Sequence, residues 1–293
     1  MDAVNPGKEE MEWIRKNFKF HPLHFNALAE HQQRPHIDHG AGYDFLVLLF
    51  PVYNPETREI IPGEVDLIVG GGFLMTAHYG EIFTLKQLFG QVKEESGLRD
   101  MFMQKGSGFL LYKVLEALLR RSYPILDHMN EDIVRVENKI FHSQGADLVS
   151  KIALMKKNII EFRKMMKTHK YVLEHLPRSK SSYLVFAQSK TYYRDLLDYS
   201  QNIWDILEAL KETADTLADT NQSLGAARLN QITKLISITS AIILPATFIA
   251  FIFGMTVENV PFRHHPNGFW IVISIMALAS LLTLFFFKKK KWF

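Results

Sequence analysis

The sequence predicts an α+β membrane protein in three parts: an N-terminal cytoplasmic α/β domain (residues 1–108), a long cytoplasmic helical stalk (109–228) and two transmembrane helices with a short outer loop (229–293). Two apolar segments predict the membrane part. Residues 235–253 and 269–287 carry no charged side chain, and each has close to the roughly 20 residues with which a helix crosses a bilayer. Strand-like segments occur only in the first part, and the remainder is helical in pattern.

The charges that flank these two segments predict their orientation. Arg228 and Lys234 precede the first segment, and four consecutive lysines, residues 288–291, follow the second. Because cytoplasmic flanks are enriched in Lys and Arg, both chain termini are expected in the cytoplasm. The connection of about 15 residues, with Pro261 and Pro266, is short enough that the two helices must be antiparallel neighbours.

Composition excludes several classes of function. The 293 residues include no cysteine, which excludes disulfides, thiolate catalysis and cysteine-ligated zinc. The net charge of +3 is smaller than the charge of the terminal lysine cluster, so basicity indicates contact with membrane lipid and not with nucleic acid. The N-terminus lacks the apolar core of a cleaved signal peptide, so insertion is expected to rely on the C-terminal segments. With no nucleophile–base pair or phosphate loop visible, neither an enzyme nor a cofactor is expected.

Residues 1–39 are polar and helical in pattern, with Trp13, Ile14 and Phe18 as the apolar face. This stretch holds five of the twelve histidines: His21, His24, His31, His36 and His39. Neutral imidazole is a common metal ligand, so metal binding is one interpretation. A surface helix and loop with unrelated histidines is the other, and we favour it.

The strands come next. Residues 43–53 (YDFLVLLFPVY) read as a buried strand, and residues 64–69 and 73–78 as a hairpin closed by Gly70, Gly71 and Gly72. A glycine triplet can cradle a phosphate, but here neither Lys-Ser/Thr nor a helix start follows it. We therefore expect a hairpin turn, and then a helix over residues 84–97.

Three long helices are predicted after this domain. Residues 109–141 form the first, with a bend at Pro124, and residues 146–176 form the second, which ends before Pro177. From residue 179 to 244 there is only one glycine and no proline before the membrane segment, which indicates one helix of some 60 residues, roughly 90 Å long. Apolar residues recur in it every seven positions, which predicts a helix-packing seam: Leu196, Ile203, Leu210, Leu217 and Leu224.

A polar stripe continues along this helix into the membrane segment. Its members are spaced alternately three and four residues apart and so share one side of the helix: Asn230, Thr233, Ser237, Ser240, Leu244, Thr247 and Phe251. Such a stripe either joins helices by hydrogen bonds or lines a water-filled path. Asp219 before it and Glu258 beyond it place acids near both ends, which favours a cation path. One helix cannot enclose a pore, so this interpretation requires a ring of chains.

At these residues the sequence resembles the CorA family of divalent-cation channels. Residues 244–256 (LPATFIAFIFGMT) are similar to the family's first span and its Gly-Met-Asn signature, and the terminal KKKKWF resembles its cationic tail. His21-Pro22-Leu23, Gln33-Arg34-Pro35 and residues 192–195 (YYRD) also match family patterns. The resemblance covers nearly the whole chain, although the family's first strands, before the helix at residues 9–19, are expected to be missing.

The resemblance implies a homopentameric funnel in the bacterial inner membrane, with a central pore of five first spans inside a ring of second spans. Divalent cations are then the substrate: Mg²⁺, or Co²⁺, Ni²⁺ or Zn²⁺. Carried over by position, Asp219, Asn230 and Leu244 line the pore, and Ile236 lies at a hydrophobic constriction. The loop that selects the ion contains Gly254, Met255, Thr256 and Glu258.

Three departures from the family pattern bear on selectivity and regulation. Thr256 replaces the signature asparagine, and Phe262, followed by Arg263, His264 and His265, replaces the second loop acid. Phe251 replaces a small residue on the pore face. In the family's regulatory metal site Asp195, with Asp198 nearby, matches the stalk acid, but the partner positions hold Ala41 and Gly42. Asp38 and Asp44 are the nearest substitutes, so a weak regulatory site is expected.

Two alternatives follow from these departures. His264 and His265 would suit a carrier of zinc or another transition metal, although an exposed loop pair without a metal role is the simpler interpretation. The loss of the signature asparagine and the bulk of Phe251 would suit a membrane scaffold or regulator of this shape that no longer conducts. The sequence leaves the identity of the ion open.

Overall fold

The computed structural model describes residues 1–29, 34–80, 82–141, 146–176, 182–184, 190–255, 261–262 and 265–290. The chain forms two compact units, Met1–Asp219 and Thr220–Phe293. One helix contributes residues to both units.

The first unit contains a five-stranded mixed sheet of order β1-β5-β4-β3-β2. Its strands are β1 (Asp2–Val4), β2 (His36–His39), β3 (Tyr43–Asn54), β4 (Glu59–Gly70) and β5 (Phe73–His78). The pair β1–β5 is parallel and the other pairs are antiparallel. The predicted strand and hairpin are confirmed as β3, β4 and β5, with β4 beginning earlier than predicted.

The prediction that residues 1–39 are helical throughout was wrong at both ends. Strand β1 precedes the first helix, and strand β2 ends the stretch. These strands have three and four residues, too few for an alternating pattern to show in the sequence. Pairing with other strands therefore determines both of them. Strand β1 pairs with β5, which is distant in the sequence, and β2 pairs with the longer strand β3.

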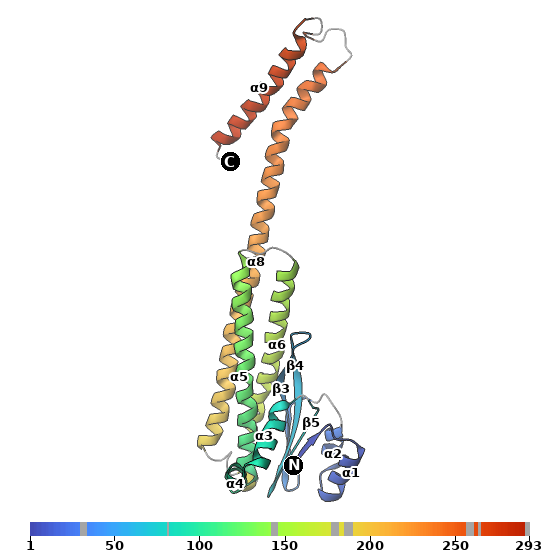
Figure 1. Cartoon of the computed structure of the whole chain (residues 1–293), viewed down its shortest axis with the longest axis vertical. Helices are drawn as coiled ribbons and strands as arrows, with labels where there is room; N and C mark the ends of the chain where they lie inside the picture. Colours follow the sequence, from blue (N-terminus) through green and yellow to red (C-terminus); the bar gives the residue numbers. More distant parts are fainter. Residues whose placement is uncertain are drawn as a thin grey trace. The chain divides into compact units, whose positions relative to one another are not determined.

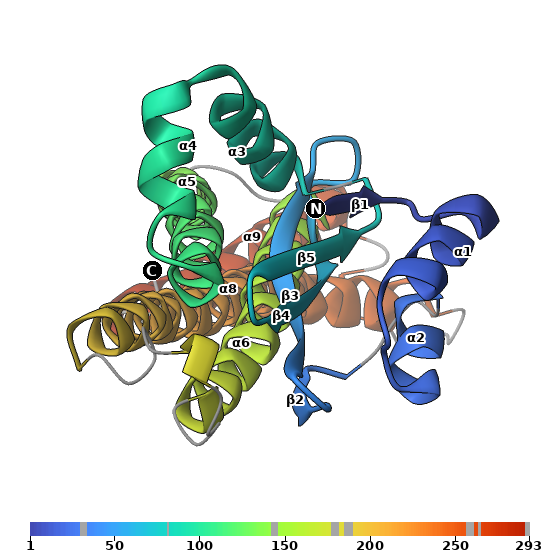
Figure 2. The ribbon, with the colours of Figure 1, turned by 90° about the horizontal axis from the view of Figure 1, so that it is seen from below.

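Two helices cover one face of the sheet: α1 (Lys8–Asn17) and α2 (Pro22–Ala29). Figure 2 shows them on the opposite side of the sheet from α5 and α6. Ile14 and Leu28 from these helices are buried with Phe45, Val47 and Ile68 of the sheet in one apolar cluster. The predicted apolar residue Ile14 is thus a core residue, whereas Trp13 beside it is half exposed.

The other face carries α5 (Ser107–Ile140) and α6 (Ala146–His175), and α3 (Phe83–Glu94) and α4 (Ser96–Met103) contact α5. The single helix predicted over residues 84–97 ends at the extended residue Glu95, where α4 begins. Helices α5 and α6 contact each other and strands β3 and β4, and run side by side in Figure 1. The two long helices predicted here are confirmed to within two residues at their ends.

The long helix is α8 (Lys190–Phe253), which follows a short turn of helix, η2 (Ser182–Leu184). Of the predicted heptad seam, Leu196 and Ile203 are fully buried, and Leu210 and Leu217 nearly so. Leu224, the fifth predicted member, belongs to the second unit and is only partly buried. Ion pairs join the same part of α8 to α6: Arg163 with Glu208, and Lys156 with Asp215 at 2.6 Å. The first four seam residues thus form a packing face within the first unit.

The second unit contains the end of α8 and α9 (Gly268–Lys289). Both helices are long and apolar enough to cross a membrane, as the sequence predicted. Pro245 lies inside α8 and cannot donate a backbone hydrogen bond to the preceding turn.

Candidate functional site

The polar stripe of α8 is exposed along its whole length in the single chain. Each of its seven members, Asn230, Thr233, Ser237, Ser240, Leu244, Thr247 and Phe251, is exposed, as is Ile236 beside it. The exposure reaches 71% for Leu244 and 73% for Phe251. No other part of the second unit among the described residues covers this side of the helix.

Helix α9 contacts a different side of α8. The Ser280 hydroxyl donates a hydrogen bond of 3.4 Å to the carbonyl oxygen of Ile242, and Ile238, one turn earlier, is only 3% exposed. At 3.6 residues per turn, Ile242 lies about 160° around the helix from Leu244. The stripe therefore faces away from the second apolar helix.

One hydroxyl of the stripe has a defined orientation. Thr247 Oγ1 donates a hydrogen bond of 2.9 Å to the carbonyl oxygen of Ile243 in its own helix. Since the proton is used in this way, the lone pairs of Oγ1 remain as acceptors on the exposed side. An oxygen in this state can bind a water molecule or a cation.

The two ends of the stripe are only partly described. Asp219, the last residue of the first unit, is exposed. At the other end α8 stops at Phe253, and a side chain at Gly254 would bring a Cβ within 3.0 Å of the Ala250 carbonyl oxygen. Met255 follows and is exposed, whereas Thr256, Glu258, Arg263 and His264 lie outside the described residues.

His265 has a structural contact in the loop. Its Nδ1 accepts a hydrogen bond of 3.1 Å from the backbone N–H of Asn267, next to the start of α9. The neutral ring must then carry its proton on Nε2. A metal bound at His265 without breaking this turn would have to displace that Nε2 proton.

The predicted regulatory residues lie on α8 and at the β2–β3 turn. The Tyr112 hydroxyl of α5 donates a 2.6 Å hydrogen bond to Asp195 Oδ2, and Asp198 is exposed one turn later. Ala41 and Gly42 form the exposed turn, with Gly42 at φ 85°. Sequence reasoning missed Tyr112, and no local pattern could have found a partner 83 residues away.

The two substitute acids beside the turn already have partners. Asp44 is buried and paired with His39. Asp38 Oδ2 lies 3.4 Å from His24 Nε2 and 3.7 Å from His36 Nε2. In the described part of the chain no group of three or more His, Asp or Glu side chains is arranged to hold a metal ion. The interpretation of these histidines as unrelated was therefore wrong for two of them, because His24 and His36 both lie beside the Asp38 carboxylate.

Comparison with known proteins identifies the family. The family model described as "CorA-like Mg2+ transporter protein" matches residues 1–289. The chain belongs to this family. Membership agrees with the two candidate spans, and the chain is an integral membrane protein of the CorA type.

Individual CorA-family members agree with this assignment. The chain is 27% identical to the cobalt/magnesium transport protein CorA of Thermotoga maritima over 278 residues, which is 94% of this chain and 77% of that one. It is 19% identical to the zinc transport protein ZntB of Yersinia pestis over 284 residues, 97% of this chain and 84% of that protein. The structure of the CorA magnesium transporter from Methanocaldococcus jannaschii superposes with a TM-score of 0.86, at 20% identity, over 100% of this chain and 90% of that chain. This likeness confirms the predicted fold class.

Proposed function

We propose that the chain assembles as a homopentamer and conducts divalent cations through a central pore lined by the polar stripe of α8. Family membership makes it a CorA-family divalent-cation transporter; the pore, the number of chains and the ion are the proposal. Neither an enzymatic step nor a resident cofactor is part of it, since the cations are the substrate. Lipid is the only other partner proposed, in a bacterial inner membrane with both termini in the cytoplasm.

The observation that carries this proposal is the placement of the stripe opposite to the contact with α9. A lone chain in a bilayer would expose the stripe to lipid, where each polar group without a partner costs on the order of a few kcal/mol. Chains arranged around an axis would bring their stripes together and leave each α9 outside. Water in the shared centre would then satisfy the hydroxyl and amide groups.

The chemistry of the stripe suits a hydrated divalent cation. Mg²⁺ gives up its water reluctantly and often keeps several water molecules when bound. The Thr247 oxygen, whose proton is held by Ile243, can accept a hydrogen bond from such a water. We assign the attraction at the two mouths to Asp219 and Glu258, and the constriction to Ile236 and Leu244.

Zinc or another transition metal is the second candidate cargo. His265 is exposed next to the start of α9, and imidazole suits Zn²⁺, Co²⁺ and Ni²⁺ better than Mg²⁺. The similarity to ZntB also supports this candidate. The proposed mouth, with Thr256 in place of asparagine, is less specific for Mg²⁺ than the family's signature loop.

The regulatory part of the proposal is a weak site. Asp195 and Asp198 are its remaining acids, and one oxygen of Asp195 already accepts a hydrogen bond from Tyr112. We infer that cytoplasmic Mg²⁺ stabilises the closed state of this chain less than it would with a complete acidic pair.

The test is flux through single-cysteine variants, because the native chain has no cysteine. The native protein in proteoliposomes should admit at least one of Mg²⁺, Co²⁺, Ni²⁺ and Zn²⁺. A cationic, water-soluble thiol reagent should block flux through Ser240→Cys, on the stripe, and leave Ile242→Cys, on the α9 side, unaffected. Equal block of both variants would reject the stripe as the pore lining. Absence of flux for all four ions would favour the non-conducting scaffold.

A further inference from the structure

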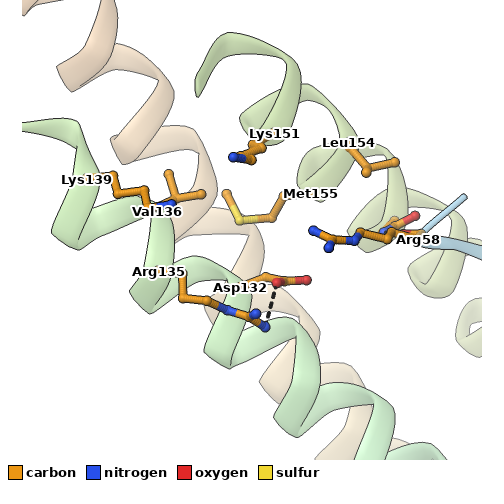
Figure 3. Close-up of a pocket in the computed structure, with 9 residues that line it drawn as sticks. Arg58, Asp132, Arg135, Val136, Lys139, Lys151, Leu154 and Met155 are labelled. Carbon is orange, nitrogen blue, oxygen red and sulfur yellow. Dashed lines mark hydrogen bonds and ion pairs between the residues drawn. The ribbon is translucent and has the colours of Figure 1, made fainter. Parts of the chain in front are cut away.

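A small basic pocket lies in the first unit, away from the stripe. It has a volume of about 150 Å³ and is formed by α5, α6 and the turn between β3 and β4. Four cationic side chains and one carboxylate line it: Arg58, Arg135, Lys139, Lys151 and Asp132. Figure 3 shows the Arg58 side chain extending from the turn toward the space between the two helices.

Nearby carboxylates pair with two of the four cations, Arg135 and Lys151. Asp132 pairs with Arg135 at 2.8 Å, and Asp147, which is outside the lining, pairs with Lys151 at 2.5 Å. In the described part of the chain no carboxylate lies within ion-pair distance of Arg58 or Lys139. The hydrogen bond from Lys151 lowers the pKa of Asp147, and the charges of Lys151 and Lys139 add to the shift. The charge of Lys139 therefore reaches Asp147, and Lys139 itself lines the pocket.

The backbone holds Arg58 in place. Asn158, on α6, is buried and donates a 2.8 Å hydrogen bond to the Arg58 carbonyl oxygen, while its side-chain oxygen accepts one of 2.9 Å from Ile60 N–H. Lys157 and Glu59 add an ion pair of 2.6 Å between the same two elements. The turn is therefore fixed against α6 at the position from which Arg58 reaches the pocket.

Arg58 also has an unusual backbone conformation. Its φ is 58°, in the left-handed region that few residues other than glycine adopt. Glycine would adopt this backbone conformation without steric cost. Compared with glycine, arginine adds a guanidinium group at this position. Arginine presents paired N–H donors that match the oxygens of a phosphate.

The floor of the pocket is apolar. Val136 and Met155 are buried beneath the charged groups, and in Figure 3 the Met155 side chain lies between α5 and α6. A space of about 150 Å³ accommodates several water molecules, which leaves room for a phosphate group.

We propose that this pocket binds a phosphate group, either free or carried by a small molecule or lipid headgroup, between Arg58 of the β3–β4 turn and Lys139 of α5. Arg135 and Lys151, each already paired with a carboxylate, line the same pocket. The site goes beyond cation transport, since it places an anion where three elements of the cytoplasmic unit meet.

The experiment is titration calorimetry of the full chain in uncharged detergent with inorganic phosphate. The native protein should bind phosphate, and added NaCl should weaken the binding. The double variant Arg58→Gln/Lys139→Gln should bind about tenfold more weakly or worse, since charge-assisted hydrogen bonds are lost. The double variant Lys93→Gln/Arg99→Gln removes two exposed charges from α3 and α4 and should bind like the native protein. Lys139→Glu alone, on an exposed helix position, should weaken binding even if the turn variant is poorly folded.

Two further arms identify the source of the phosphate. Native mass spectrometry with dioctanoyl phosphatidic acid and with dioctanoylglycerol tests for a lipid headgroup. Binding of phosphatidic acid alone, abolished by Arg58→Gln/Lys139→Gln, assigns the site to a lipid, and binding of inorganic phosphate alone assigns it to a soluble ligand. Failure of both probes to bind, or equal loss in the pocket and control variants, would overturn the proposal. Neither binding measurement depends on ion flux. A failure of the phosphate proposal can therefore be distinguished from a failure of the proposed pore.

Discussion

The Tyr112 hydroxyl donates a 2.6 Å hydrogen bond to Oδ2 of Asp195 and thereby joins α5 to α8. Burial raises the pKa of Tyr112, and the hydrogen bond to Asp195 adds to the increase. The phenol therefore remains a donor at any physiological pH. In this arrangement the carboxylate that would bind a regulatory cation is already part of the helix packing.

We predict that Asp195→Ala destabilises the first unit but changes its response to Mg²⁺ little. Loss of a hydrogen bond to a charged acceptor should lower the free energy of unfolding by about 1–3 kcal/mol. Protection from proteolysis by millimolar Mg²⁺ should be weak in the native chain and nearly the same in the variant. Asp198→Ala, at an exposed position, is the control and should leave stability unchanged. Strong protection that disappears in Asp195→Ala would contradict this prediction.

The sequence predicted the elements whose patterns are long. Two uncharged segments, a heptad seam and a long apolar strand were each visible over ten or more residues, and each is present. Strands β1 and β2 were not predicted because their three or four residues depend on partners elsewhere in the chain. The same reason applies to Tyr112 and Asp195, which only the fold brings together.

The sequence likewise predicted only part of the candidate site. A helical repeat identified the stripe, because all of its residues lie on one helix. The side on which α9 packs could not be predicted, since nearly every residue of α9 is apolar and no face of that helix stands out. The basic pocket was invisible in the sequence, because its charges come from two helices and a turn.

We predict that the first unit loses stability in acid through His169. Its Nε2–H donates a 2.7 Å hydrogen bond to the Leu49 carbonyl oxygen, and burial lowers its pKa to about 4. Above the unfolded value of roughly 6.5 the ring is neutral in both states, so the hydrogen bond contributes its full stability. As the pH falls from there toward 4, only the unfolded chain takes up the proton, and stability decreases by up to about 1.4 kcal/mol per pH unit.

The measurement is thermal unfolding of the native chain and His169→Gln between pH 7.5 and 4.5. Glutamine keeps a donor for Leu49 but does not titrate, so the difference in melting temperature should shrink as the pH falls. A difference independent of pH would show that His169 does not titrate as inferred.

The buried acid Asp66 should have the opposite dependence on pH. Burial raises its pKa to about 8, and the neighbouring Glu64 adds to the increase. Its Oδ1 has no hydrogen-bond partner among the described residues. The neutral form therefore favours folding: this contribution is complete below the unfolded pKa of roughly 3.9 and is lost as the pH rises through 8. Asp66→Asn should gain stability relative to the native chain from pH 5 to pH 8, measured by denaturant unfolding. No gain across this range would mean that the Asp66 carboxylate has the same pKa in both states.

Assembly should bring the stripes of neighbouring chains together. Leu244 is 71% exposed in the single chain, so Leu244→Cys should react with a short bismaleimide to give linked pairs of chains, since each chain then carries a single thiol. Ile242→Cys, toward α9, should give little linkage under the same conditions. Native mass measurement of the unlinked protein in detergent should find five chains. A monomer or dimer would be incompatible with a pore formed by this stripe.

The last prediction concerns the loop at the end of α8, where Thr256 replaces the asparagine of the family signature. Threonine offers one hydroxyl oxygen on a short side chain, whereas the amide oxygen of asparagine reaches further and accepts hydrogen bonds from the waters of a hydrated ion. A ring of threonines should therefore hold hydrated Mg²⁺ weakly, and Glu258 should supply most of the remaining attraction, which salt screens. Thr256→Asn should raise Mg²⁺ flux in proteoliposomes several-fold over the native chain, with Thr256→Ser as a control that keeps the hydroxyl. Changing His264 and His265 to alanine should lower Zn²⁺, Co²⁺ and Ni²⁺ flux relative to Mg²⁺ if imidazole attracts those ions at the mouth. If Thr256→Asn leaves Mg²⁺ flux unchanged and the double alanine variant keeps the native order of ions, selection occurs deeper in the pore, along the stripe of hydroxyls between Thr233 and Thr247.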